Sequence, residues 1–248
     1  MTLPILGLPG RKPRIFENIL NRQGYLLQEG NMQWVSITDD RPRVKQTTNI
    51  IGKLQEDGSI DGQAICYYYD YAKSFMLDST IDDDEEDKFF DKKPMGLKIL
   101  SSKMDQTSGD DQPLQQNIEF HFQPQNTDNY FFVNPQLLAS QKPNPFRKET
   151  RFTDVDFGCN QEIFSSFQLE IPPSFELDHP LTNMVIRAPD SSFYFKRLFS
   201  MDSTHVRISL LFQIQRSIFG KEEYKGVQEF FNRIYALMAE EIVLRKKK

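Results

Sequence analysis

The side chains best suited to nucleophilic or metal chemistry are two cysteines, Cys66 and Cys159, and three histidines, His121, His179 and His205. A cysteine nucleophile needs a base that generates the thiolate and a group that orients this base. No histidine lies within four residues of another histidine or of a cysteine, so the sequence contains no local metal-binding or nucleophile motif. Two cysteines are also too few for a thiolate zinc site or a disulfide scaffold, and their pairing stays open.

The surroundings of the two cysteines differ. Cys66 falls in the middle of a predicted strand beside three tyrosines, which is typical of a core cysteine. Cys159 follows the turn-rich sequence 156–158, and we expect it to be the more exposed of the two. An enzyme that uses Cys159 with one of the histidines is therefore one hypothesis, but no catalytic residue is assigned.

Other motifs point to binding or to solvation rather than to a reaction. The run 82–87 has six contiguous acids and no glycine, whereas a calcium loop alternates its ligands around a glycine, so we expect a solvated charge run. Trp34, Tyr67 and Tyr69 are candidate ligand-contact aromatics, although strand aromatics more often pair across strands. The chain has no phosphate-binding glycine loop and no zinc-protease motif. We predict neither a metal nor a cofactor.

Charge and hydropathy exclude some partners. The 248 residues carry a net charge of −5, which argues against nucleic acid because phosphate binding needs a basic face. No apolar run approaches the roughly 20 residues of a membrane span, so we do not expect an integral membrane protein. The apolar residues 3–9 precede the first basic cluster, which reverses the order of a secretory signal.

Strand patterns dominate the chain, and aromatic residues make up 12% of it, which favours a mainly β fold. Short strands are expected at 24–27 and 33–37 around a turn at 29–31. A hairpin is expected over 44–69, with Ile60, Ala64, Cys66 and Tyr68 on its inward face. Turn-rich sequences over 134–160 form the best boundary between two units.

We predict two antiparallel β-sandwich-like units with one C-terminal helix. Residues 1–40 form an irregular N-terminal segment with short strands, and 41–140 a β-rich unit with an acidic insertion near 78–93. Residues 141–248 form a second sandwich-like unit. A helix near 221–244 closes this unit, because Val227, Phe230, Phe231 and Ile234 recur at the spacing of one buried helix face.

Short motifs along nearly the whole chain, in a shared order, resemble one bacterial family. They are Leu3–Pro9, Leu20–Gly24, Trp34–Val35, Glu56–Gly62, Tyr69–Ala72, Val133–Pro135, Asn144–Phe146, Asp154–Gly158, Ile171–Pro173, Phe219–Tyr224 and Ile242–Leu244. The family comprises multi-domain proteins with a central transglutaminase-like core between two β-rich domains of unknown function. The chain resembles the part from the end of this core to the C-terminus. The family's catalytic residues would lie upstream, so none is carried over.

The resemblance implies a non-catalytic accessory β-module of a larger transglutaminase-like or cysteine-protease-like protein, which scaffolds the core or presents partners or substrates to it. It also implies an exported, periplasmic parent whose signal peptide lies outside these residues; a cytoplasmic location is the alternative. The upstream core is then the expected partner. Two other hypotheses stay open: a free-standing glycan- or peptide-binding β-sandwich, and the Cys159-dependent enzyme.

Overall fold

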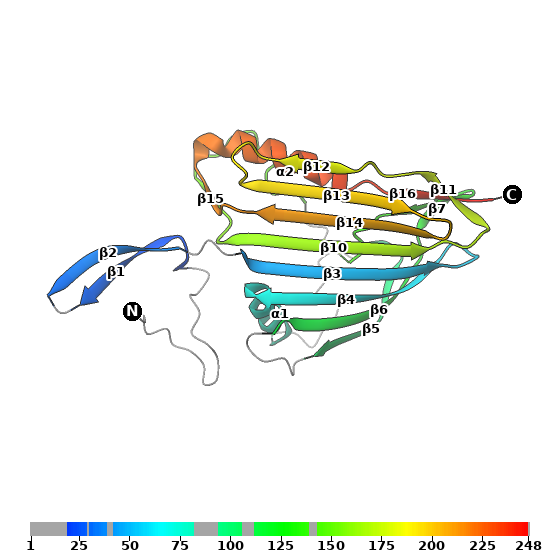
Figure 1. The fold of residues 1–248 in the computed structure, drawn as a ribbon, viewed down its shortest axis with the longest axis horizontal. Coiled ribbons are helices and arrows are strands. Elements are labelled where there is room, and N and C mark those ends of the chain that lie inside the picture. The colour runs from blue at the N-terminus through cyan, green and yellow to red at the C-terminus, as the bar shows by residue number, and fades with distance from the viewer. Residues whose placement is uncertain are drawn as a thin grey trace.

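The computed structural model describes residues 19–28, 30–38, 42–81, 94–105, 112–138 and 143–247. Strands hold 55% of the residues and helices 13%, which confirms the predicted mainly β class. The central feature is an eight-stranded sheet with the order β12-β13-β14-β10-β3-β4-β6-β5 (Figure 1). Its strands in chain order are β3 (Pro42–Leu54), β4 (Ile60–Asp70), β5 (Leu97–Asp105), β6 (Leu114–Phe122), β10 (Asn160–Glu170), β12 (Met184–Arg187), β13 (Phe193–Met201) and β14 (His205–Ile214).

This sheet consists of two antiparallel halves that meet at one parallel pair. Strands β3 to β6 come from the predicted unit 41–140, and β10, β12, β13 and β14 come from the predicted unit 141–248. The two halves join where β3 runs parallel to β10, with Phe167 opposite Ile50. Within each predicted unit the strands of this sheet pair antiparallel, as expected, and the parallel pair joins the two units, an arrangement that the sequence did not predict. The predicted domain limits themselves stay predictions.

A second, four-stranded sheet with the order β11-β16-β8-β7 packs against the large one. Its strands are β7 (Gln125–Thr127), β8 (Tyr130–Val133), β11 (Phe175–His179) and β16 (Ile242–Lys246). Phe131 and Phe175 meet edge to face with ring centroids 5.4 Å apart, and they share one core with the inward residues of the large sheet. Both predicted units thus contribute strands to both layers of the sandwich.

Within the described residues, the helices α1 and α2 and a small two-stranded sheet complete this body. Helix α1 (Tyr71–Ile81) follows β4 directly. Helix α2 (Tyr224–Met238) follows a 3₁₀ turn, η3 (Lys221–Glu223), and covers the inward residues of β13 and β14. The short strands β9 (Val155–Asp156) and β15 (Ile218–Phe219) pair with each other near the start of α2. None of the helices within the described ranges is long and apolar enough to cross a membrane.

The predicted end of the C-terminal helix is wrong. The helix ends at Met238, and residues 242–246 form strand β16 between β8 and β11. Ile242 and Leu244 are fully buried while Val243 between them is not, an alternation that belongs to a strand. The apolar residues at this end therefore complete the second sheet instead of extending the helix.

A two-stranded arm projects from the body (Figure 1). It consists of β1 (Arg22–Gln28) and β2 (Asn31–Ile37), and Gly30 takes a φ of 76° at its turn. At the base of the arm, the Asn21 side-chain amide donates to the Gly158 carbonyl oxygen over 2.7 Å. The strands expected at 24–27 and 33–37 are confirmed. The acidic run at 82–87 lies outside the described residues.

Candidate functional site

A cleft of about 620 Å³ opens between strand β12, the loop that follows it and the N-terminal half of helix α2. Two segments far apart in sequence form its walls, 186–193 and 216–233. The lining residues are Ile186, Arg187, Ala188, Pro189, Asp190, Ser192, Phe193, Arg216, Phe219, Glu222, Glu223, Gly226, Val227, Glu229, Phe230 and Arg233. A cleft of this size matches the usual dimensions of a ligand site.

The floor of the cleft is apolar and closely packed. The ring of Phe193 stacks on Phe219 with centroids 4.6 Å apart and on Phe230 with centroids 4.8 Å apart. All three side chains are buried. Gly226 lies above this floor on α2, and a Cβ atom added there would meet nothing within 4 Å. The helix therefore leaves room at Gly226 for a ligand to approach its backbone.

Arg216 organises the rim at the N-terminal end of α2. Its guanidinium lies 3.1 Å from the Asp190 carboxylate and 2.5 Å from the Glu223 carboxylate. It also lies over the Phe219 ring, 4.2 Å from the centroid. A hydrogen bond from the Ser192 hydroxyl and the positive charge of Arg216 both lower the pKa of the Asp190 carboxyl group. The Arg216 hydrogen bond lowers the pKa of Glu223. Both carboxylates are therefore ionised at neutral pH, and the rim is ordered before a ligand arrives.

Both cysteines lie away from the cleft, and no disulfide joins them. Cys66 faces inward on β4 as predicted and is 3% exposed, and burial raises the pKa of its thiol. The expectation that Cys159 is the more exposed cysteine is wrong, because its side chain is only 2% exposed. It packs with Leu20 and Tyr71 in a small core at the base of the arm.

The three histidines lie on different strands, each beside a carboxylate. His121 on β6 contacts Asp61 at 2.7 Å, and His179 on β11 contacts Asp178 at 2.5 Å. His205, at the start of β14, lies 3.5 Å from Asp202. None of the three lines the cleft.

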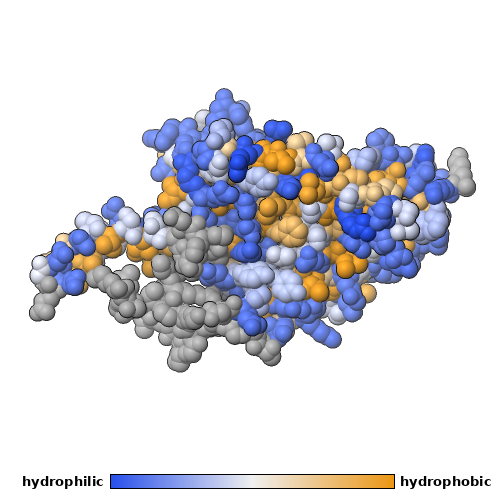
Figure 2. Space-filling view, in the orientation of Figure 1, coloured by the Kyte–Doolittle hydropathy of each residue, from blue (hydrophilic) through white to orange (hydrophobic). Residues whose placement is uncertain are grey.

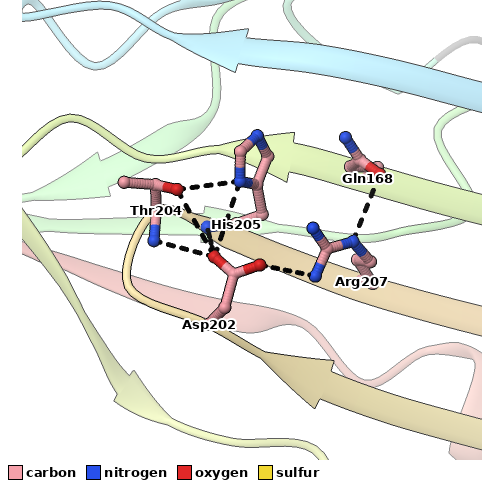
Figure 3. A network of polar contacts seen from close by, with 5 residues as sticks. All are labelled: Gln168, Asp202, Thr204, His205 and Arg207. Carbon is pink, nitrogen blue, oxygen red and sulfur yellow. Dashed lines mark hydrogen bonds and ion pairs between the residues drawn. The ribbon is translucent and has the colours of Figure 1, made fainter.

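The surroundings of His205 form a polar network at the turn between β13 and β14 (Figure 3). Asp202 accepts hydrogen bonds from the backbone amides of Thr204 and His205, each over 2.9 Å, and from the Arg207 guanidinium over 2.7 Å. These backbone bonds and the Arg207 charge hold the pKa of Asp202 well below its usual range. Arg207 also donates to Gln168 on the neighbouring strand. This network closes a turn and links it to β10.

The three candidate aromatics lie on two separate elements. Trp34 lies on the arm, where its ring centroid is 4.9 Å from that of Tyr25. Tyr67 and Tyr69 lie on the outward face of β4, and the Lys45 ammonium is 5.6 Å from the Tyr69 ring centroid. Figure 2 shows apolar colour on the arm and over the middle of the outward sheet face. The arm therefore has an aromatic surface of its own, apart from Tyr67 and Tyr69.

The sequence patterns do not identify the cleft, because two strands and a turn separate the two walls of the cleft along the chain. One local signal was available. Gly226 lies in the first turn of the amphipathic helix α2, where glycine is a weaker helix former than alanine. A Cβ atom at Gly226 would meet nothing within 4 Å, so this glycine marks an open position beside the helix.

The cleft lies wholly within the part of the chain that resembles a known family. Residues 128–244 match the family described as a domain of unknown function with solved-structure structure (DUF3858). The match begins just before β8 and ends within β16, so it includes α2 and leaves out the arm and strands β3 to β6. No curated protein matches the chain.

Proposed function

We propose that this chain is a non-catalytic accessory β-module that binds a polypeptide segment of a partner protein in the cleft between β12 and α2. The carrying observation is the cleft itself, with a buried apolar floor beneath a rim that Arg216 already orders. Ligand sites in proteins are mostly apolar clefts with a few precisely placed polar groups. A preordered rim also lowers the entropy cost of binding.

The composition of the cleft favours binding over chemistry. Its lining contains neither cysteine nor histidine. Among the described lining residues the one hydroxyl side chain is that of Ser192, which donates to the Asp190 carboxylate over 2.6 Å instead of to a base that would activate it. The ionised Asp190 and Glu223 are each held by Arg216. These groups are arranged to keep their charges rather than to exchange protons.

The same cleft favours a peptide over a glycan. Sugar recognition uses an open aromatic ring face, but Phe193, Phe219 and Phe230 are buried beneath the cleft surface and stack on one another. The exposed Trp34 belongs to the arm, and its ring is tilted by 58° from that of Tyr25. The two rings therefore do not form a flat platform.

The transglutaminase-like core suggested by the sequence motifs is the partner that we propose for this module, in an exported protein. The arm supports a second contact with a partner. Cross-strand pairing places Tyr25 opposite Trp34 and Leu27 opposite Met32, on one face. All four side chains are at least half exposed. An apolar face of this kind on a projecting hairpin is typical of an interaction surface.

The test of the cleft uses the purified chain and a displayed library of random heptapeptides. Selected peptides should bind the native chain and lose affinity when Gly226→Leu fills the space above the floor. Lys225→Leu adds the same side chain to the same turn, at an exposed position that does not line the cleft, and should leave binding unchanged. A selection without binders, or binders that both variants retain equally, would refute the proposal.

A further inference from the structure

We infer that the cleft takes its peptide in extended form, as an additional strand on β12 with apolar side chains at alternate positions and one basic side chain. This inference rests on the proposed function and specifies the class of ligand and its mode of binding. Strand addition at a sheet edge supplies main-chain hydrogen bonds for affinity and side-chain pockets for specificity.

Strand β12 has the edge that this mode needs. Among the described residues, it pairs on one side only, with β13, and it ends the order of the large sheet. The Ala188 amide donates to the Phe193 carbonyl oxygen over 3.0 Å. Hydrogen-bonded and non-hydrogen-bonded pairs alternate along an antiparallel ladder. Because Ala188 bonds to β13, the amide and carbonyl groups of Val185 and Arg187 point away from β13, toward the position of an added strand.

The cleft lies where every second side chain of such a strand would point. Ile186 and Ala188, from β12 and its continuation, line the cleft on one side, and α2 lines it on the other. Val185 and Arg187 belong to the opposite, outward face, because successive residues of a strand alternate. The inward side chains of an added strand would therefore rest on the buried Phe230 and in the space at Gly226.

The charges of the cleft specify the remaining feature of the peptide. Arg187 extends over the Tyr194 ring on the outward face. The other charged residues among the described lining are two arginines, Arg216 and Arg233, against four acids, Asp190, Glu222, Glu223 and Glu229. Arg216 already contacts two of these acids. The excess of two negative charges favours a peptide with a basic side chain at the rim.

The test removes one backbone hydrogen-bond donor at the free edge of β12 without changing a side chain that lines the cleft. Val185→Pro deletes the amide that faces away from β13, and proline is accepted on edge strands. Peptides selected on the native chain should bind this variant about tenfold more weakly or worse, as expected for a lost hydrogen bond with an unpaired partner. Val185→Thr keeps the amide and should bind normally. Circular dichroism checks that both variants are folded.

A second measurement keeps the test valid if Val185→Pro does not fold. Peptides N-methylated at successive positions should bind the native chain with alternate loss and retention, because only every second amide of an added strand faces β12. Equal binding by Val185→Pro together with loss by Gly226→Leu would overturn strand addition and leave the cleft as a peptide site. Uniform tolerance of N-methylation would also overturn strand addition. Binding that neither substitution affects would remove both proposals.

Discussion

The guanidinium of Arg197 on β13 donates a hydrogen bond to the carbonyl oxygen of Leu237, in the last turn of α2, over 2.9 Å. Arg197 is only 2% exposed, and its Nε atom donates to the Thr182 carbonyl oxygen over 3.0 Å. Glu240 lies 2.8 Å from the same guanidinium. A cation at a helix C-terminus satisfies carbonyl groups that have no partner in the helix. One buried arginine thus joins α2, the wall of the cleft, to the large sheet.

Replacing Arg197 should destabilise the protein strongly. Arg197→Met preserves much of the side-chain volume but leaves the carbonyls of Thr182 and Leu237 without this donor, so we expect a loss of about 3 kcal/mol in the free energy of unfolding. Urea titration followed by circular dichroism measures it. Lys196→Met, on the outward face of the same strand, is the control and should change stability little. Unchanged stability of Arg197→Met would show that these carbonyls do not depend on the arginine.

The aromatic face of α2 supports a second stability prediction. The Phe231 ring lies 4.6 Å from that of Phe146 and stacks on Phe157 at 5.7 Å. Phe231→Ala should cost about 3–5 kcal/mol, because the cavity adds to the lost burial. Phe152→Ala, at a side chain that is 90% exposed, should stay within about 0.5 kcal/mol of the native protein. Thermal unfolding of the two variants compares them directly, and similar melting temperatures would contradict the packing described here.

Local patterns in the sequence predict much of the fold but little of the cleft. The inward face of β4 and the buried face of α2 follow from periods of two and of 3.6 residues, which a short window contains. The parallel pairing of β3 with β10 joins residues more than 100 positions apart, and no local signal specifies it. Burial of Cys159 by the base of the arm is likewise a tertiary effect. The cleft also depends on such packing, and only Gly226 indicates it locally.

The turn network at Asp202 predicts a dependence of stability on pH. The folded state lowers the pKa of this carboxyl group, so its ionised form stabilises the fold at neutral pH. This contribution is complete above the unfolded pKa of about 3.9 and is lost as the pH falls through the lower folded value. Asp202→Asn should therefore be less stable than the native protein at pH 7, and the difference should shrink below about pH 4. Asp128→Asn, at another turn, controls for loss of one negative charge. A stability difference between Asp202→Asn and the native protein that stays constant from pH 7 to below pH 4 would contradict the stabilising role of the ionised Asp202.

The two thiols should be unreactive until the protein unfolds. Cys66 and Cys159 are both buried, and burial raises the pKa of Cys66, which lowers its thiolate fraction. A colorimetric thiol reagent at pH 8 should label neither residue in the native protein and both in guanidinium chloride. Cys66→Ala and Cys159→Ala assign the labelling to each site. Rapid native labelling of Cys159 would restore the hypothesis that this cysteine is a nucleophile.

The arm offers a direct spectroscopic test through Trp34, the single tryptophan of the chain. Its side chain is 66% exposed, so its emission in the native protein should resemble that of the unfolded protein. Circular dichroism should then detect unfolding, whereas the tryptophan emission should change little over the same transition. Binding of a partner to the arm should shift the emission to shorter wavelength, and Leu27→Ser together with Met32→Ser should abolish this shift while leaving the fold intact. Blue-shifted emission that reverts on dilution would show instead that the arms of two copies bury each other.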